Sequence, residues 1–172
     1  KKDKNILSLR GMTSLYRIED IIKSRNNSNI SDWSLSFIYP FFDNKYKNHI
    51  QSKFINTDLD IGRLEKKSYY KLLVSSPIAI SIPVSDSSPR SVFEAIFCGC
   101  VVLITYHLYY ETLPECMKKR VVIVSLDQNN WLENAIIRAK LIMNDKYIPS
   151  KKALKMFDQN NTFDKMYECI FS

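Results

Sequence analysis

Short apolar runs alternate with longer amphipathic stretches along most of this chain. The apolar runs are rich in Ile, Val and Leu, and several have no polar residue at their centre, such as Val101–Ile104. Continuous apolar runs of this length are typical of strands that are buried on both faces of a sheet. The pattern predicts six strands, over residues 6–9, 33–39, 58–61, 78–82, 100–105 and 121–126.

The amphipathic stretches between these runs predict helices. In residues 15–24, for example, Leu15, Ile18, Ile21 and Ile22 fall on one helical face. Strands that alternate with helices indicate an α/β fold, a Rossmann-like parallel sheet with helices on both faces. Ligands of such folds bind at the carboxyl ends of the strands. The predicted helices cover residues 15–24, 44–54, 66–75, 91–97, 111–117, 131–143, 150–157 and 163–171.

Length and composition indicate one domain over residues 1–172, because 172 residues with a hydrophobic fraction of 45% can form one good core. No apolar run is long enough to span a bilayer, and no signal peptide pattern is present. The chain begins at Lys1 without a Met. We therefore expect a cytoplasmic protein, and we expect this chain to be a fragment of a longer one.

The net charge of +7 comes from basic residues scattered in small clusters. Nucleic-acid binding needs a basic patch and a recognisable module, and neither is found. Attraction to phosphorylated ligands or to the anionic inner face of a membrane is the simpler interpretation. Two histidines without a paired Cys-x-x-Cys spacing argue against a metal site. The sequence Asp58-Leu59-Asp60 has the form of a metal-binding DxD motif, which we interpret as a chance match.

A polar loop after strand 78–82 carries the clearest functional signal. It contains Asp86, Ser88 and Ser91 and leads directly into a helix with Glu94 near its first turn. Unpaired N–H groups at a helix start favour a phosphate, and neighbouring carboxylates suit sugar hydroxyls. The loop therefore indicates a site for a nucleotide-sugar. The chain has three glycines and no GxGxxG pattern, which argues against NAD or FAD.

Structural interpretations of the same residues stay open. Ser91 and Glu94 have the spacing of a capping box. Pro89 favours the first helical position, which would make Ser88 the N-cap. Asp86 also suits a simple turn.

This region resembles the donor-binding region of GT-B glycosyltransferases, in particular family 4, the glycosyltransferase group 1 domain. The likeness rests on Asp86-x7-Glu94, then Ala95, then Gly99 before an apolar strand. The family has Glu at the first position, where this chain has the shorter Asp86.

Further positions extend the likeness. Arg10, after the first strand, matches an Arg that reaches the donor diphosphate. Arg17 is the candidate replacement for a companion Lys that this chain lacks. The segment Gly62-Arg63-Leu64 matches a loop beside the nucleobase, and Tyr110-Glu111 resembles a Glu that follows the next strand.

The resemblance implies the C-terminal, donor-binding half of a retaining glycosyltransferase that needs no metal and no cofactor. Its substrates would be a nucleotide-diphospho-sugar donor and a glycan or lipid-linked acceptor of cell-envelope polysaccharide synthesis. The acceptor half would lie outside this fragment, which we expect to be inactive alone. By this match Asp86, Glu94 and Arg10 are catalytic, contacting the sugar, the ribose and the diphosphate. Donor-binding residues would be Arg17, Gly62, Arg63, Leu64, Ser88, Pro89, Arg90, Ser91 and Val92.

Two other functions remain. A non-catalytic α/β interaction or scaffold domain is favoured by Asp86 in place of Glu and by the missing Lys. A nucleic-acid-binding domain is supported only by the net charge.

Overall fold

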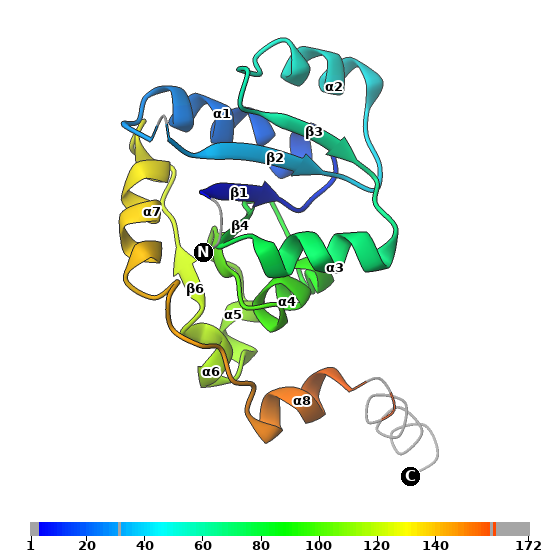
Figure 1. The fold of residues 1–172 in the computed structure, drawn as a ribbon, viewed down its shortest axis with the longest axis vertical. Coiled ribbons are helices and arrows are strands. Elements are labelled where there is room, and N and C mark those ends of the chain that lie inside the picture. Colours follow the sequence, from blue (N-terminus) through cyan, green and yellow to red (C-terminus); the bar gives the residue numbers. More distant parts are fainter. Residues whose placement is uncertain (1–3, 31, 159, 161–172) are drawn as a thin grey trace.

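A six-stranded parallel sheet forms the centre of the protein in the computed structural model, which describes residues 4–30, 32–158 and 160 (Figure 1). The strand order is β3-β2-β1-β4-β5-β6. Every strand predicted from the apolar runs is present, with boundaries that differ by a few residues. The strands are β1 (Asn5–Ser8), β2 (Ser34–Ile38), β3 (Leu59–Gly62), β4 (Ile78–Ser81), β5 (Val101–Ile104) and β6 (Val121–Ile123).

Helices cover both faces of this sheet, which confirms the predicted Rossmann-like α/β fold. The helices are α1 (Ile18–Asn26), α2 (Asn44–Gln51), α3 (Lys66–Ser75), α4 (Arg90–Phe97), α5 (Tyr109–Thr112), α6 (Glu115–Lys118), α7 (Trp131–Lys140) and α8 (Lys151–Phe157). A short 3-10 turn, η1 (Ser14–Tyr16), precedes α1. The helix predicted over 163–171 lies outside the described residues.

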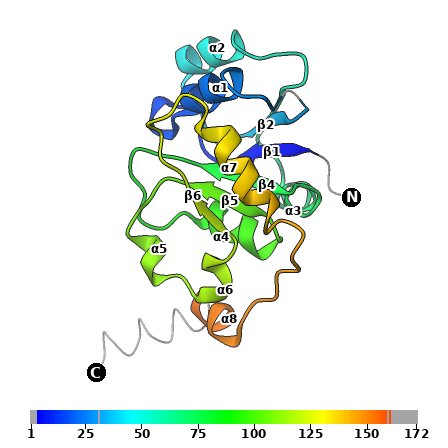
Figure 2. The same cartoon turned by 90° about the vertical axis from the view of Figure 1, so that its left-hand side faces the viewer.

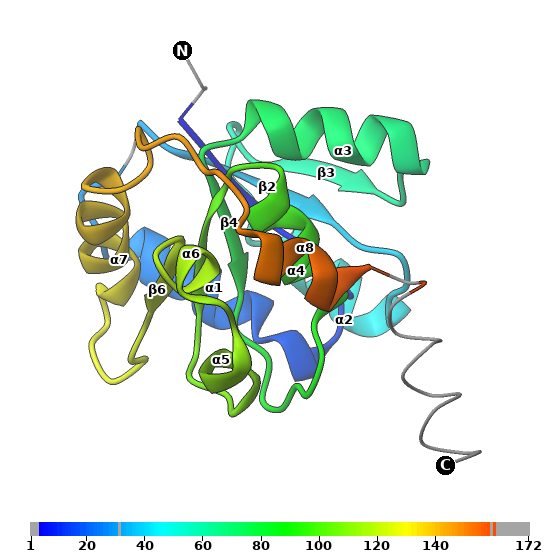
Figure 3. The same ribbon diagram turned by 90° about the horizontal axis from the view of Figure 1, so that it is seen from below.

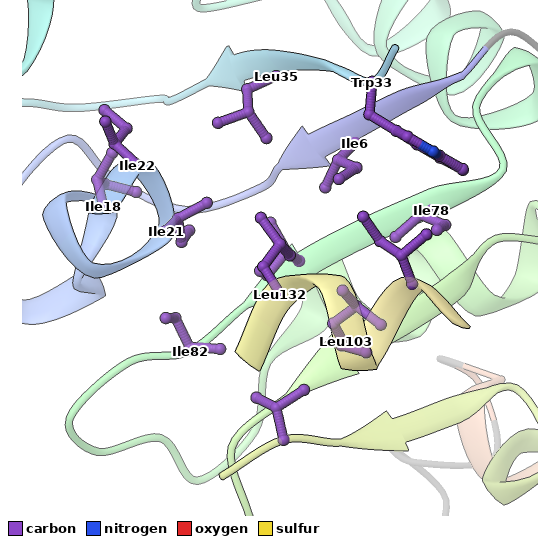
Figure 4. Packing of buried hydrophobic residues seen from close by; sticks show 14 of the residues in the cluster. Ile6, Ile18, Ile21, Ile22, Trp33, Leu35, Ile78, Ile82, Leu103 and Leu132 are labelled. Atoms are coloured by element: carbon purple, nitrogen blue, oxygen red, sulfur yellow. The ribbon is translucent and has the colours of Figure 1, made fainter. Parts of the chain in front are cut away.

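Alternate residues of the strands other than β3 contribute to two separate cores. Ile6, Ile78 and Leu103 pack on one face with side chains of α1 and α7, including Ile21 and Leu132 (Figure 4). Their neighbours in sequence, such as Leu7, Ala79 and Val102, pack on the other face with α3 and α4. Figure 2 shows α7 beside α1 on the first face, and Figure 3 shows α8 against α4 on the second. The period-two alternation therefore fixes both faces of the sheet.

Two predicted helices are different in the structure. The helix predicted from Leu15 begins only at Ile18, because Arg17 adopts a left-handed conformation with φ 50° and separates η1 from α1. The helix predicted over 111–117 is two short helices, α5 and α6. Leu113, between them, is extended (ψ 140°), because it is followed by Pro114 and a proline disfavours the helical conformation in the residue before it.

No helix in the described part of the chain is long and apolar enough to cross a bilayer.

Candidate functional site

The strand order creates a switch point between β1 and β4. From β1 the chain continues to β2 and β3 on one side, and β4 leads to β5 and β6 on the other. The loops that leave the carboxyl ends of β1 and β4 therefore diverge, and open α/β sheets bind their ligands at such a point. These two loops carry Arg10 and Asp86, so the topology places both predicted residues at the ligand-binding edge.

Arg10, Asp86 and Ser91 meet at this edge. Arg10 Nη2 lies 3.1 Å from Asp86 Oδ2 in an ion pair, and Arg10 Nη1 donates a hydrogen bond to Ser91 Oγ at 3.1 Å. The pair is largely shielded from solvent, because the side chains are 19% and 9% exposed. Three residues separated by as many as 81 positions thus form one polar cluster.

Aromatic rings complete the surroundings of Arg10. Its guanidinium lies 5.0 Å from the centre of the Tyr16 ring, and Tyr16 in turn packs against Phe41 at 6.0 Å. Phe41 lies so close to Gly11 that a Cβ atom there would come within 2.3 Å of the ring. The glycine after Arg10 therefore allows the Phe41 ring to cover this backbone.

Glu94 lies further along α4, where its Oε1 accepts hydrogen bonds from Tyr70 Oη at 3.1 Å and from Arg90 Nε at 3.2 Å. Neither contact is with a backbone N–H at the start of the helix. The capping box with Ser91 is therefore not formed. The N-cap position belongs to Pro89 and no side chain caps the helix, so the prediction of Ser88 as N-cap is wrong.

A pocket of about 650 Å³ opens beside Glu94 and includes Arg63, Leu64 and Tyr69 in its lining. The adjoining Gly62 ends β3 with φ +69°, a conformation that favours glycine. The loop predicted to lie beside a nucleobase and the carboxylate predicted to hold a ribose are thus in one pocket. Burial, and then the charge of Glu94, raises the pKa of Tyr69.

A second pocket, of about 860 Å³, follows the other side of α4 toward α8. Ser88 and Arg90 lie at its polar end, and Phe93 and Phe157 form part of its apolar wall, with ring centres 4.7 Å apart. Glu94 borders both pockets.

Pro89 and Val92, at the start of α4, are both buried. The Val92 N–H donates to the Pro89 carbonyl at 3.0 Å. This amide therefore has an acceptor within the chain, and a donor-binding role for Val92 stays a prediction. Ser91 remains in the first turn, where helical amides lack an acceptor within the helix.

Arg17 is placed elsewhere. It lines a polar pocket of about 540 Å³ together with Asp20, Lys23, Thr105 and Asp127. The structure thus brings together Arg10, Asp86 and Ser91, and separately Glu94 with Arg63 and Leu64, but it does not join Arg17 to either group.

There was no reason in the sequence to predict Tyr16 and Tyr70 as site residues. Their contacts with Arg10 and Glu94 depend on the fold and leave no pattern in the sequence. Tyr109 is also close to the site: burial, and then the charge of Asp86, raises its pKa.

The carboxylates of the DxD sequence have structural partners. Asp58 pairs with Arg25 at 2.7 Å, and Asp60 accepts a hydrogen bond from Tyr39 Oη at 2.6 Å. Across the described residues, no group of three His, Cys, Asp or Glu side chains is arranged to hold a metal ion.

Comparison with solved structures shows that the α/β fold of this chain matches GT-B glycosyltransferase domains at low sequence identity. A glycosyltransferase from Rickettsia africae superposes with a TM-score of 0.76 at 16% identity, over 98% of this chain and 47% of that one. Sucrose-phosphate synthase from Thermosynechococcus elongatus gives 0.67 at 13% identity, over 97% and 46%. The catalytic domain of cholesterol-alpha-glucosyltransferase from Helicobacter pylori gives 0.63 at 13% identity, over 88% and 98%.

No protein-family model matches the sequence, and no curated protein matches it. The chain spans about half the length of the first two structures. The likeness therefore defines the fold.

Proposed function

We propose that this chain is the C-terminal, donor-binding half of a retaining glycosyltransferase of family 4 type, which transfers a sugar from a nucleotide-diphospho-sugar to a glycan or lipid-linked acceptor. The observation that carries the proposal is the meeting of Arg10, Asp86 and Ser91 at the switch point, with Glu94 further along the same helix. The three solved structures compared above, which are glycosyltransferases, support the same class.

The donor would lie along the carboxyl edge of the sheet. Its base would occupy the pocket at Gly62–Leu64, whose volume of about 650 Å³ is within the range of small-molecule sites. Glu94, at the border of that pocket, would accept hydrogen bonds from the ribose hydroxyls. The diphosphate would then reach Arg10 and the first turn of α4 at Ser91. The transferred sugar would lie at Asp86.

Sugar transfer in this arrangement would depend on stabilising the negative charge that develops on the leaving diphosphate. Breaking the bond between sugar and diphosphate places negative charge on the departing phosphate oxygen and positive charge on the sugar. A guanidinium fixed beside that oxygen stabilises the transition state more than the ground state. Arg10 supplies this charge from a rigid strand end. No metal or cofactor is part of the proposal.

A second domain would complete the site. Several large apolar side chains are exposed on the segments that follow β1, β2, β4 and β5, at the carboxyl edge of the sheet. Together with the half-length match, this exposure supports the proposal that another domain would cover the edge and bring the acceptor. The fragment would then be inactive alone. The exposed residues are Leu15, Phe41, Phe42, Val84, Tyr106 and Leu108.

The proposed acceptor and the charge of the chain suggest where in the cell the protein would work. A lipid-linked acceptor and a net charge of +7 favour a cytoplasmic protein that works at the inner face of a membrane, in the synthesis of cell-envelope polysaccharide.

Calorimetric titration with UDP, GDP and ADP tests the donor site. We expect one of them to bind saturably, and we expect Glu94→Ala to abolish the binding because the ribose loses its acceptor. Glu115→Ala, which removes an exposed carboxylate on α6, is the matched control and should bind as the original chain does. Circular dichroism checks that both variants fold. The proposal fails if no nucleoside diphosphate binds, or if Glu94→Ala leaves the affinity unchanged.

One observation favours the second candidate, a non-catalytic interaction or scaffold domain. The Arg10–Asp86 ion pair neutralises the charge that a diphosphate would need. A scaffold would keep this pair for stability and would bind none of the three nucleotides.

A further inference from the structure

The guanidinium of Arg10 is occupied by groups of its own chain on several sides. Asp86 pairs with Nη2, Ser91 accepts from Nη1, and the Tyr16 ring covers one face. An incoming diphosphate that uses the remaining N–H groups of Arg10 would therefore lie beside the Asp86 carboxylate and compete with it for the guanidinium charge.

Asp86 depends on the same contact. Its Oδ2 atom is buried, and no group in the described residues donates a well-aligned hydrogen bond to it. The positive charge of Arg10 is therefore its main compensation, since a buried carboxylate without a partner is costly. Burial, and then the charge of Asp86, raises the pKa of the neighbouring Tyr109, and a neutral phenol supplies no positive charge to the carboxylate.

We propose that the Arg10–Asp86 pair is an ionic lock that makes the site select a complete nucleotide-sugar over the bare nucleoside diphosphate. The inference rests on the proposed function. When the diphosphate takes Arg10, Asp86 loses its partner. A donor with its sugar attached replaces that partner with hydroxyl groups, which donate hydrogen bonds to the carboxylate. A nucleoside diphosphate has no hydroxyl groups at this position, because its ribose lies at Glu94, and its phosphate charge lies beside an uncompensated carboxylate.

The consequence concerns the end of the reaction. The product that leaves the site is the nucleoside diphosphate, and the re-forming ion pair displaces it from Arg10. The lock thus weakens product binding without weakening donor binding to the same extent. Asp86 is in this sense a specificity-determining residue.

Asp86→Asn tests the lock because it removes the charge and keeps the shape. We expect the variant to bind inorganic pyrophosphate and the matching nucleoside diphosphate about tenfold more tightly than the original chain, since the repulsion and the competition for Arg10 are both gone. The nucleotide-sugar with the same base should gain less, because Asn is a weaker acceptor for its hydroxyls. The ratio of the two dissociation constants, measured by calorimetry, should therefore fall toward one.

Asp145→Asn is the matched control, since it changes the net charge equally at an exposed position away from Arg10 and should alter no affinity. Asp86→Ser replaces Asp86→Asn if thermal unfolding shows that the latter does not fold. If the original chain binds a nucleoside diphosphate and neither Asp86 variant binds it more tightly, the lock is wrong and the donor site stands. If no variant and no original chain binds any of them, the donor site itself is wrong and the lock falls with it.

Discussion

Asp58 shows how a residue that resembles a metal ligand serves the fold. Its carboxylate is fully buried and forms two contacts with Arg25, at 2.7 and 3.1 Å. The Ile55 N–H also donates to it, at 2.9 Å. This pair ties α1 to the start of β3, and it leaves no oxygen available for a cation.

Removing Asp58 should destabilise the protein strongly. In Asp58→Ala the Arg25 charge stays buried without a partner, which costs about 3–5 kcal/mol of unfolding free energy. Urea unfolding followed by circular dichroism measures the change. Asp60→Ala is the control, and we expect a smaller loss because Asp60 is 25% exposed. A loss below about 1 kcal/mol in Asp58→Ala would show that the pair contributes little.

The site could be predicted from the sequence only in part. Arg10 and Asp86 were predictable because each follows an apolar run, and the carboxyl ends of parallel strands meet at one edge. The ion pair between them could not be predicted, because it depends on the length and direction of both side chains. The same holds for Tyr70, whose hydroxyl reaches Glu94 from a neighbouring helix. Donor-binding roles for all these residues stay predictions.

At the scale of elements, a long-range contact explains why α1 does not begin at residue 15, as the periodicity predicts. The carbonyl of Leu15 accepts the Val84 N–H at 2.9 Å and is therefore not the first carbonyl of a helix. Val84 is in a loop far along the chain, so local periodicity in residues 15–24 carries no record of this contact. Pro114, in contrast, is visible in the sequence, and the break between α5 and α6 could have been predicted from it.

A side-chain acceptor joins helices α1 and α7. Ser24 Oγ, in α1, accepts the Leu132 N–H at 2.9 Å in the first turn of α7, and Ser24 is buried. Ser24→Ala leaves this helix amide without an acceptor and should cost about 1–2 kcal/mol of unfolding free energy.

Chemical unfolding measures this cost. Ser75→Ala, whose hydroxyl is exposed and bonds only within its own helix, is the control and should change stability by less than about 0.5 kcal/mol. Equal effects of the two substitutions would mean that the contact between α1 and α7 does not contribute.

At the scale of the whole molecule, the alternation of strands and helices was sufficient to predict the fold class. The order β3-β2-β1-β4-β5-β6 was not contained in that pattern, because apolar runs do not specify their neighbours. The order decides which two loops flank the switch point. It is therefore the feature that converts scattered candidate residues into one site.

Three tyrosines with raised pKa values make the stability of the molecule sensitive to alkali. Burial is the first cause that raises the pKa of Tyr69, Tyr109 and Tyr147 above the ordinary value of 10.0. Above that value the unfolded chain loses these protons while the folded protein keeps them. The unfolding free energy should therefore be unaffected by these groups below about pH 10 and should fall as pH rises further.

Urea unfolding between about pH 8 and 11 measures this dependence. In a variant with Phe at all three positions, the unfolding free energy should fall less steeply with pH, because these three differences in pKa between the folded and unfolded states are gone. An identical slope in the two proteins would contradict the role of these three side chains.

The most direct test of the donor site is amide NMR during titration with UDP, GDP and ADP. The account predicts that one nucleotide causes saturable shifts at the carboxyl ends of β1 and β4, in the first turn of α4 and at Gly62–Leu64. Shifts restricted to the opposite edge of the sheet, or no shift with any of the three, would contradict it.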